Sequence, residues 1–232
     1  MARFFRHPGI LLRSHSRLVS SRRRRTDLRL RKQAKIIGVV LAGGNSSRMG
    51  RDKALLPLAG AHHDILGRTV SLLQEVCGRA IVVGRQMQGY ACVLDIAPNC
   101  GPVGGVATAL DYCQDAACLV LSCDLPFMRK DLLLHLIQHR KHRPRGTHIT
   151  AYKHAVTGKI ESMAAIYEPE CLPYFQICVN ERLLKINRVV PSYHYHHLEY
   201  GEKDAQAFFN LNYPADYETA CNLMGKANLH LT

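Results

Sequence analysis

The sequence predicts a three-layer α/β fold, in which a doubly wound, mostly parallel sheet lies between layers of helices. Residues 36–42 (IIGVVLA) and 117–122 (ACLVLS) are continuous apolar runs, which are typical of parallel strands buried on both faces. Segments with helical periodicity alternate with such runs, as expected for right-handed crossover units. The 232 residues, 47% of them hydrophobic, are enough for one domain of this class.

The first half of the chain supplies four of the expected strands. The run at 36–42 is followed by a polar, glycine-rich loop and by a helix whose apolar residues recur at helical spacing. Two short β-rich runs come next, and then a helix with Pro102 at its start, where a missing N–H is harmless. The buried apolar run at 117–122 and a further helix complete this half. The expected strands are 36–42, 80–83, 91–96 and 117–122, and the expected helices are 64–77, 102–113 and 130–139.

The second half begins with a basic turn at 139–145 and is less regular. Two β-rich runs flank a turn at Thr157 and Gly158, two apolar segments have helical spacing, and Pro214 marks the first turn of a closing helix. The expected strands are 147–152, 162–167 and 208–211, and the expected helices are 169–179, 182–187 and 214–223.

The charge of the chain is concentrated in its first residues. Residues 1–35 hold twelve Lys or Arg and one acid, whereas the other 197 residues hold 19 basic and 17 acidic groups, a net charge of +2. A nearly neutral domain makes nucleic acid an unexpected partner. We therefore divide the chain into a basic extension, 1–34, and a single domain, 35–232. The extension is interpreted as a disordered tail, a transit peptide or the product of an upstream start codon.

The nine cysteines and the clustered histidines carry no expected metal site. No CxxC pair or zinc spacing occurs, so we expect buried free thiols in a cytoplasmic protein. His194, His196 and His197 have no accompanying acid or cysteine at ligand spacing, and a polar surface strand explains them. No run is apolar enough to cross a membrane.

Residues 41–53 (LAGGNSSRMGRDK) form the segment with the clearest chemistry. Glycines such as Gly43 and Gly44 let backbone N–H groups approach phosphate oxygens. Arg48 and Lys53 add positive charge over a polyphosphate. The glycine spacing fits neither a Walker A loop nor GxGxxG. The segment therefore predicts a loop that binds a nucleoside triphosphate but belongs to neither of these two motifs.

Three further segments lie where the predicted strands end or helices begin. Asp124, in CDLP, is a hard oxygen ligand suited to Mg²⁺, although it could instead cap a helix. Gly101 and Gly105, in GPVGG, permit close approach to a ligand or close packing of helix on sheet. Asn210 and Asn212 are expected on one face of a strand end, where they could orient a ligand or cap the last helix. Ligands bind at the carboxyl ends of such strands, so we expect these segments to face one crevice.

Taken together, these segments resemble the molybdenum cofactor guanylyltransferases. The family pattern LAGGxSxRMGxDKxLLxLxG corresponds to residues 41–60, and GPVGG, CDLPFM and NLNYPAD match at 101–105, 123–128 and 210–216. The resemblance spans about residues 36–224 and implies a Rossmann-like fold of the nucleotide-diphospho-sugar transferase type. The chain departs from the family at Gly84, where an Asn is frequent, and at Ser162, where a Pro is frequent.

The resemblance implies transfer of GMP from GTP to molybdopterin, with Mg²⁺ as cofactor and pyrophosphate released. The catalytic residues would be Arg48, Lys53 and Asp124, with Asp124 as the metal ligand. Asp95 would lie near the base or ribose, and Asn210 and Asn212 would face the same site. The full set expected at the nucleotide is Leu41, Ala42, Gly43, Gly44, Lys53, Asp95, Gly101, Gly105 and Asp124. The implied partners beyond the substrates are other cofactor-biosynthesis proteins or a molybdoenzyme.

Three alternatives stay open at this point. A sister enzyme could use CTP or another nucleotide, as in molybdopterin cytidylyltransferases and in sugar or isoprenoid pathways. Gly44 favours guanine, because the cytidine-using relatives more often read LAAG. The second alternative is a non-catalytic relative of these enzymes. The third is a protein that binds RNA through its basic tail.

Overall fold

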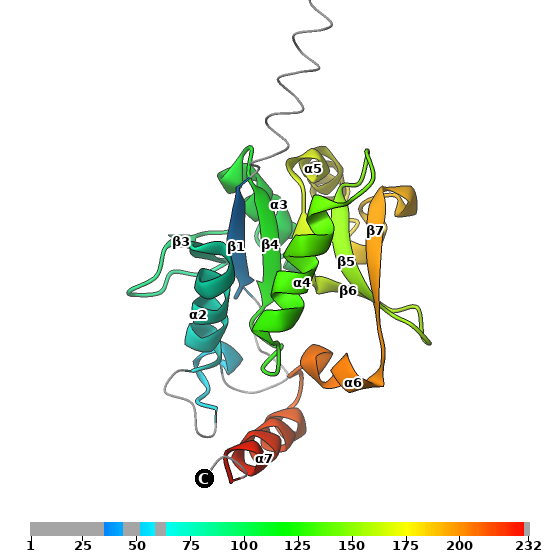
Figure 1. The fold of residues 1–232 in the computed structure, drawn as a ribbon. Helices are drawn as coiled ribbons and strands as arrows, with labels where there is room; N and C mark the ends of the chain where they lie inside the picture. The colour runs from blue at the N-terminus through cyan, green and yellow to red at the C-terminus, as the bar shows by residue number, and fades with distance from the viewer. Residues whose placement is uncertain (1–34, 44–51, 59–63, 230–232) are drawn as a thin grey trace, which may run out of the picture. The chain divides into compact units, whose positions relative to one another are not determined.

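The structure, a computed structural model, describes residues 35–43, 52–58 and 64–229. These residues form a seven-stranded sheet with the strand order β3-β2-β1-β4-β6-β5-β7 (Figure 1). Only the pairs that involve β6 are antiparallel, which confirms the mostly parallel sheet. The strands are β1 (Ile36–Leu41), β2 (Ala80–Val83), β3 (Cys92–Val93), β4 (Ala117–Ser122), β5 (Ile149–His154), β6 (Ile160–Tyr167) and β7 (Tyr195–Tyr200).

Helices cover both faces of the sheet, because side chains alternate along each central strand. Val40 and Leu119 point to the face covered by α2 (Ile65–Cys77) and α4 (Lys130–Lys141). Val39 and Val120 point to the opposite face, under α3 (Gly101–Cys113) and α5 (Leu172–Asn180). Figure 1 shows α2 and α4 in front of the sheet and α3 and α5 behind it. This three-layer arrangement is the predicted one.

Local signals in the sequence explain where the first helices begin and end. The Asp64 carboxylate accepts a hydrogen bond from the Gly67 N–H at 2.7 Å and caps α2. Gly78 ends that helix in a left-handed conformation, with φ of 74°. Pro102 lies in the first turn of α3, as expected.

The strand order reverses at the centre of the sheet. β1 pairs with β2 on one side and with β4 on the other, and in the second pair Leu41 lies opposite Ser122. The helices that follow β1 and β4 cover one face, and the helix between β3 and β4 covers the other. In such sheets a crevice opens at the carboxyl ends of the strands beside the reversal. The residues after Leu41 and Ser122 are therefore placed next to each other.

Three predicted elements are wrong or shorter than expected. The strand at 91–96 is reduced to Cys92–Val93, because the chain leaves the sheet edge and Leu94 is 63% exposed. The helix at 182–187 is reduced to a 3-10 turn at its end (Ile186–Arg188), because the positive φ of Arg182, 57°, interrupts the helical backbone. The strand at 208–211 is absent. A 3-10 turn (Gln206–Phe208) ends at its expected first residue, and the chain then continues as a loop in which Leu211 is buried.

Smaller differences concern the ends of elements in the second half. α4 continues to Lys141, β5 and β6 are shifted or lengthened by two residues, and the closing helix α7 (Pro214–Leu229) is longer than expected. The helix predicted at 169–179 divides into a 3-10 turn (Pro169–Cys171) and α5. The short helix α6 (Glu202–Ala205) was not predicted.

The histidines and cysteines occupy ordinary structural positions. β7 is the edge strand that carries His196 and His197, and His194 lies in the 3-10 turn before it. All nine cysteines are free thiols. Within the described residues, no helix is long and apolar enough to cross a membrane.

Candidate active site

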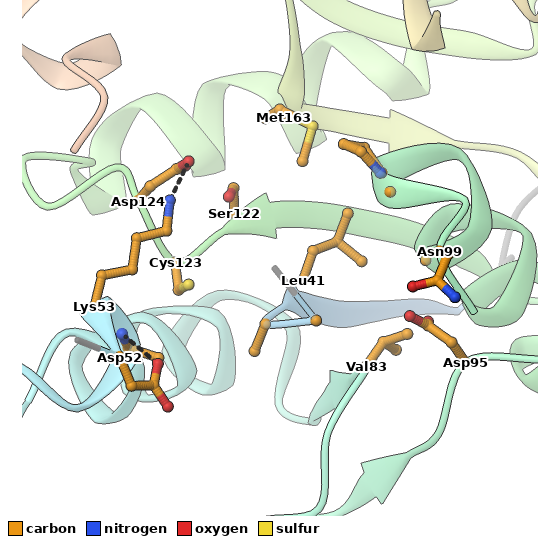
Figure 2. Close-up of a pocket in the computed structure, with 16 residues that line it drawn as sticks. Leu41, Asp52, Lys53, Val83, Asp95, Asn99, Ser122, Cys123, Asp124 and Met163 are labelled. Carbon is orange, nitrogen blue, oxygen red and sulfur yellow. Dashed lines mark hydrogen bonds and ion pairs between the residues drawn. The ribbon is translucent and has the colours of Figure 1, made fainter. Parts of the chain in front are cut away.

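A cavity of about 440 Å³ opens at the carboxyl ends of β1 and β4, where the strand order reverses (Figure 2). This volume is in the range of small-molecule sites. Lys53 and Asp124 lie at one end of the cavity, and Asp95 and Asn99 lie at the other. The lining residues are Leu41, Ala42, Gly43, Asp52, Lys53, Ala54, Val83, Asp95, Asn99, Gly101, Pro102, Gly105, Ser122, Cys123, Asp124 and Met163.

An ion pair between Lys53 and Asp124 defines the first end of the cavity. The Lys53 Nζ atom lies 3.0 Å from Asp124 Oδ2 and also donates to the Leu211 carbonyl at 3.2 Å. The other carboxylate oxygen, Asp124 Oδ1, is buried and has no hydrogen-bond partner among the described residues. A buried carboxylate oxygen without a partner is unfavourable unless a ligand satisfies it. This end is therefore suited to bind a cation and polyphosphate oxygens.

The turn that carries Lys53 is fixed by its neighbour Asp52. Asp52 Oδ1 accepts from the Ala54 N–H at 3.1 Å and caps the 3-10 turn Lys53–Leu55. Asp52 Oδ2 lies 2.5 Å from Arg85 Nη2, just beyond the end of β2. The hydrogen bond from Arg85 holds the pKa of Asp52 below its ordinary value. The carboxylate thus stays charged and ties the Lys53 turn to the end of the neighbouring strand.

The second end of the cavity depends on a close approach between two glycines. Gly84 follows β2 with φ of 97°, and a Cβ atom built on it would lie 2.5 Å from Gly43 Cα and 2.7 Å from Gly43 N. A Cβ atom on Gly43 would lie 3.0 Å from Asp95 Oδ2. Only glycine permits this backbone separation at position 84. The close approach places the Gly43 backbone directly beside the Asp95 carboxylate.

Asp95 is a carboxylate in a partly apolar setting. Burial raises its pKa above the ordinary value, and a hydrogen bond with Thr108 opposes this shift. Its Oδ1 atom is buried and has no hydrogen-bond partner within the described part of the chain. The group can therefore accept hydrogen bonds from a ligand that carries N–H or O–H donors.

Comparison with known proteins identifies the family. Residues 38–194, more than half of the chain, match the family described as "MobA-like NTP transferase domain". The chain belongs to this family. Its fold and its family are those of nucleotidyltransferases, so the cavity at the reversal of strand order is the candidate active site of this MobA-like domain.

Individual relatives agree with this assignment. A "Molybdenum cofactor guanylyltransferase" of Xanthomonas euvesicatoria is 41% identical over 107 residues, which cover 46% of this chain and 56% of that protein. A "Probable molybdenum cofactor guanylyltransferase" of Pelotomaculum thermopropionicum is 28% identical over 189 residues, or 77% of this chain and 88% of that protein. The crystal structure of molybdopterin-guanine dinucleotide biosynthesis protein A from Archaeoglobus fulgidus has a TM-score of 0.64 at 21% identity. The matched residues cover 82% of this chain and 99% of the Archaeoglobus protein, and the similarity supports the fold.

Most of the residues that the sequence singles out in the MobA-like domain line this same cavity. They are Leu41, Ala42, Gly43, Lys53, Asp95, Gly101, Gly105 and Asp124. Gly44 and Arg48 lie outside the described residues. The sequence interpretation missed Asp52, Arg85 and Asn99. For Asp52 the signal was its place before Lys53, where a short polar side chain can cap a turn.

Asn210 and Asn212 do not share a strand face, because the predicted strand is absent, and neither lines the cavity. Asn210 Nδ2 donates to the Phe208 carbonyl at 3.3 Å, and the Asn212 N–H donates to Asp216 Oδ2 at 2.9 Å. The residue between them contributes instead: Leu211 is fully buried, its N–H donates to the Asp124 carbonyl, and its own carbonyl accepts from Lys53. This loop supports the site through its backbone.

Proposed function

We propose that the protein transfers GMP from GTP to molybdopterin, forming the guanine dinucleotide of the cofactor and releasing pyrophosphate. The observation that carries the proposal is the Lys53–Asp124 pair, with its unpartnered carboxylate oxygen, at one end of a cavity at the reversal of strand order. The names of the relatives, molybdenum cofactor guanylyltransferases, supply the substrate class. GTP and molybdopterin are thus the proposed substrates.

We infer that Mg²⁺ is the cofactor and that Asp124 is its protein ligand. Within the described residues, no group of three or more His, Cys, Asp or Glu side chains could hold a metal. Mg²⁺ is commonly bound by one or two protein carboxylates, with phosphate oxygens and waters completing its shell. Asp124 Oδ1 is the oxygen available for this role. When bound, Mg²⁺ supplies positive charge that neutralises the phosphate oxygens.

The protein's own residues would then bind and orient the reactants for an in-line displacement. The terminal phosphate of molybdopterin attacks the α-phosphorus of GTP, and the bond to pyrophosphate breaks. The nucleophile is already ionised near neutral pH, so no general base is required. Lys53 would stabilise the charge that develops on the leaving pyrophosphate. Arg48 and the N–H groups of Gly43 and Gly44 are proposed to do the same.

Guanine is the proposed base because Asp95 lies at the end of the cavity away from Lys53. A carboxylate accepts hydrogen bonds, and guanine presents the N1–H and N2 amino donors side by side. The corresponding atoms of cytosine, O2 and N3, are acceptors and would face the carboxylate unfavourably. The main competing function, transfer of CMP from CTP, is therefore disfavoured by the same residue.

Calorimetric titration with GTP and CTP, each with and without Mg²⁺, tests the proposal. We expect GTP to bind more tightly than CTP and only weakly without Mg²⁺. Incubation with GTP and molybdopterin should then yield the dinucleotide and pyrophosphate in equal amounts. Asp124→Asn, which keeps the size of the side chain, should abolish the Mg²⁺ dependence while circular dichroism stays unchanged. Tighter binding of CTP, or GTP binding without any transfer to molybdopterin, would contradict the proposed reaction.

We further propose that residues 35–232 form a single nucleotidyltransferase domain and that the protein acts in the cytoplasm. Lys35–Thr232 is one compact unit, and residues 1–34 lie outside the described part of the chain. A variant that begins at residue 35 should keep full GTP binding and turnover. Lost activity in this variant, with the fold intact, would instead assign a role to the basic extension.

A further inference from the structure

Asn99 is a residue of the cavity to which neither the sequence patterns nor the Lys53–Asp124 chemistry gives a role. It precedes α3 with φ of 63°, a left-handed conformation that few residues other than Gly and Asn adopt readily. Its side chain lines the cavity and points toward Asp95 (Figure 2). Within the described residues the carboxamide forms no hydrogen bond with another side chain or backbone group. A carboxamide at a cavity that has no hydrogen-bond partner within the protein is available to a ligand.

Asp95 alone does not distinguish guanine from every other base. Its carboxylate can only accept hydrogen bonds, and in another orientation of the base the single amino group of adenine or cytosine could also donate one hydrogen bond to it. A second polar group beside it is needed to distinguish the neighbouring atom of the base edge. Guanine presents the acceptor O6 there, next to N1–H. Asn99 is the lining residue that faces Asp95 and carries a side-chain N–H donor.

We propose that Asn99 is a specificity-determining residue, whose carboxamide donates a hydrogen bond to O6 of guanine while Asp95 accepts from N1–H and the N2 amino group. The proposal rests on the proposed function, since it assumes that GTP is the bound nucleotide. The two side chains would then match the whole donor and acceptor pattern of one edge of guanine. Adenine would place its unprotonated N1 against Asp95, and cytosine would place two acceptors there.

The conformation of Asn99 selects the variants for the test. Asn99→Gly removes the carboxamide, and glycine adopts a φ of 63° without strain. Asn99→Asp keeps the size and the tolerance of this backbone conformation but replaces the donor with an acceptor. Gln114→Gly is the matched control: Gln114 also has a positive φ, 52°, and carries a carboxamide, but it lies at the other end of α3 and outside the cavity.

The experiment measures binding of GTP, CTP, 6-thio-GTP and ITP to the full chain with Mg²⁺. Sulfur at position 6 is a weak acceptor, and ITP lacks only the N2 amino group, so the two analogues probe Asn99 and Asp95 separately. We expect the native chain to prefer GTP over 6-thio-GTP by about tenfold, the factor expected for one hydrogen bond. Asn99→Gly should reduce this ratio to about one and leave the ratio of GTP to ITP unchanged. Asn99→Asp should weaken GTP binding more than Asn99→Gly, and Gln114→Gly should change nothing.

Two negative outcomes are distinguishable. A native chain that binds CTP as tightly as GTP would contradict the proposed function itself, whatever the variants do. A native chain that prefers GTP over CTP, together with an Asn99→Gly variant that keeps the full preference for GTP over 6-thio-GTP, would overturn the role of Asn99 alone. The same holds if the native chain does not distinguish GTP from 6-thio-GTP.

Discussion

The close approach of Gly84 to Gly43 can be tested by adding one carbon atom. In Gly84→Ala the new Cβ atom would lie 2.5 Å from Gly43 Cα, whereas ordinary contacts begin near 3.4 Å. The two backbone segments would have to separate by about 1 Å. Overpacking of this kind costs about 1–3 kcal/mol, and a positive φ for alanine costs about another 1–2 kcal/mol. The loss of unfolding free energy should therefore be about 2–5 kcal/mol.

The separation would also displace the Gly43 backbone from Asp95 and from the nucleotide. We expect the melting temperature of Gly84→Ala to fall by about 4–20 °C, because 1 kcal/mol corresponds to about 2–4 °C in a domain of this size. GTP affinity, measured by calorimetry well below the melting temperature, should fall by more than about tenfold, or ~1.4 kcal/mol.

Gly89→Ala is the matched control. Gly89 also has a positive φ, 85°, but a Cβ atom there would meet nothing within 4 Å. This variant carries the conformational cost without the clash, so it should lose about 1–2 kcal/mol of stability and no GTP affinity. If Gly84→Ala melted and bound GTP as Gly89→Ala does, the argument that a close approach shapes the nucleotide site would be wrong.

Three further predictions concern the charged groups. Lys53→Ala should lower kcat/KM, with the fold retained, by the factor that corresponds to a loss of about 2–4 kcal/mol of transition-state stabilisation. Near-normal turnover of this variant would remove Lys53 from the mechanism. Glu168→Gln should destabilise the domain by about 3–5 kcal/mol in urea unfolding, because Glu168 is 2% exposed and its carboxylate pairs with the buried Arg140 at 2.7 Å; an unchanged midpoint would contradict this. Burial, and after it neighbouring positive groups, lowers the pKa of His139, His148 and His197 below 6.5. The unfolded chain then binds these protons first, so the unfolding free energy should decrease as pH falls below about 6.5, and a flat stability profile from pH 7.5 to 5.5 would refute the reasoning.

The central part of the fold could be predicted from the sequence, because its signals are local. The strands at 36–42 and 117–122 are buried on both faces, so their apolar runs are continuous and were placed within one residue. Capping by Asp64 and the position of Pro102 likewise act within a few residues. The errors at 182–187 and 208–211 arose where tertiary anchors decide the backbone. Leu211, for example, is held by hydrogen bonds to Asp124 and Lys53, which are distant in sequence.

The sequence by itself determined the class of the fold and the chemical character of the site, since the glycine-rich segment and Asp124 both follow strands that are plain from their composition. Only the tertiary structure decided which side chains meet. It joins Arg85 to Asp52, brings Gly84 against Gly43, and places Asn99 beside Asp95 at the same end of the cavity. It also brings the backbone carbonyl of Leu211 to Lys53. These contacts depend on the order of strands in the sheet and on single backbone angles, neither of which a pattern of residue types specifies.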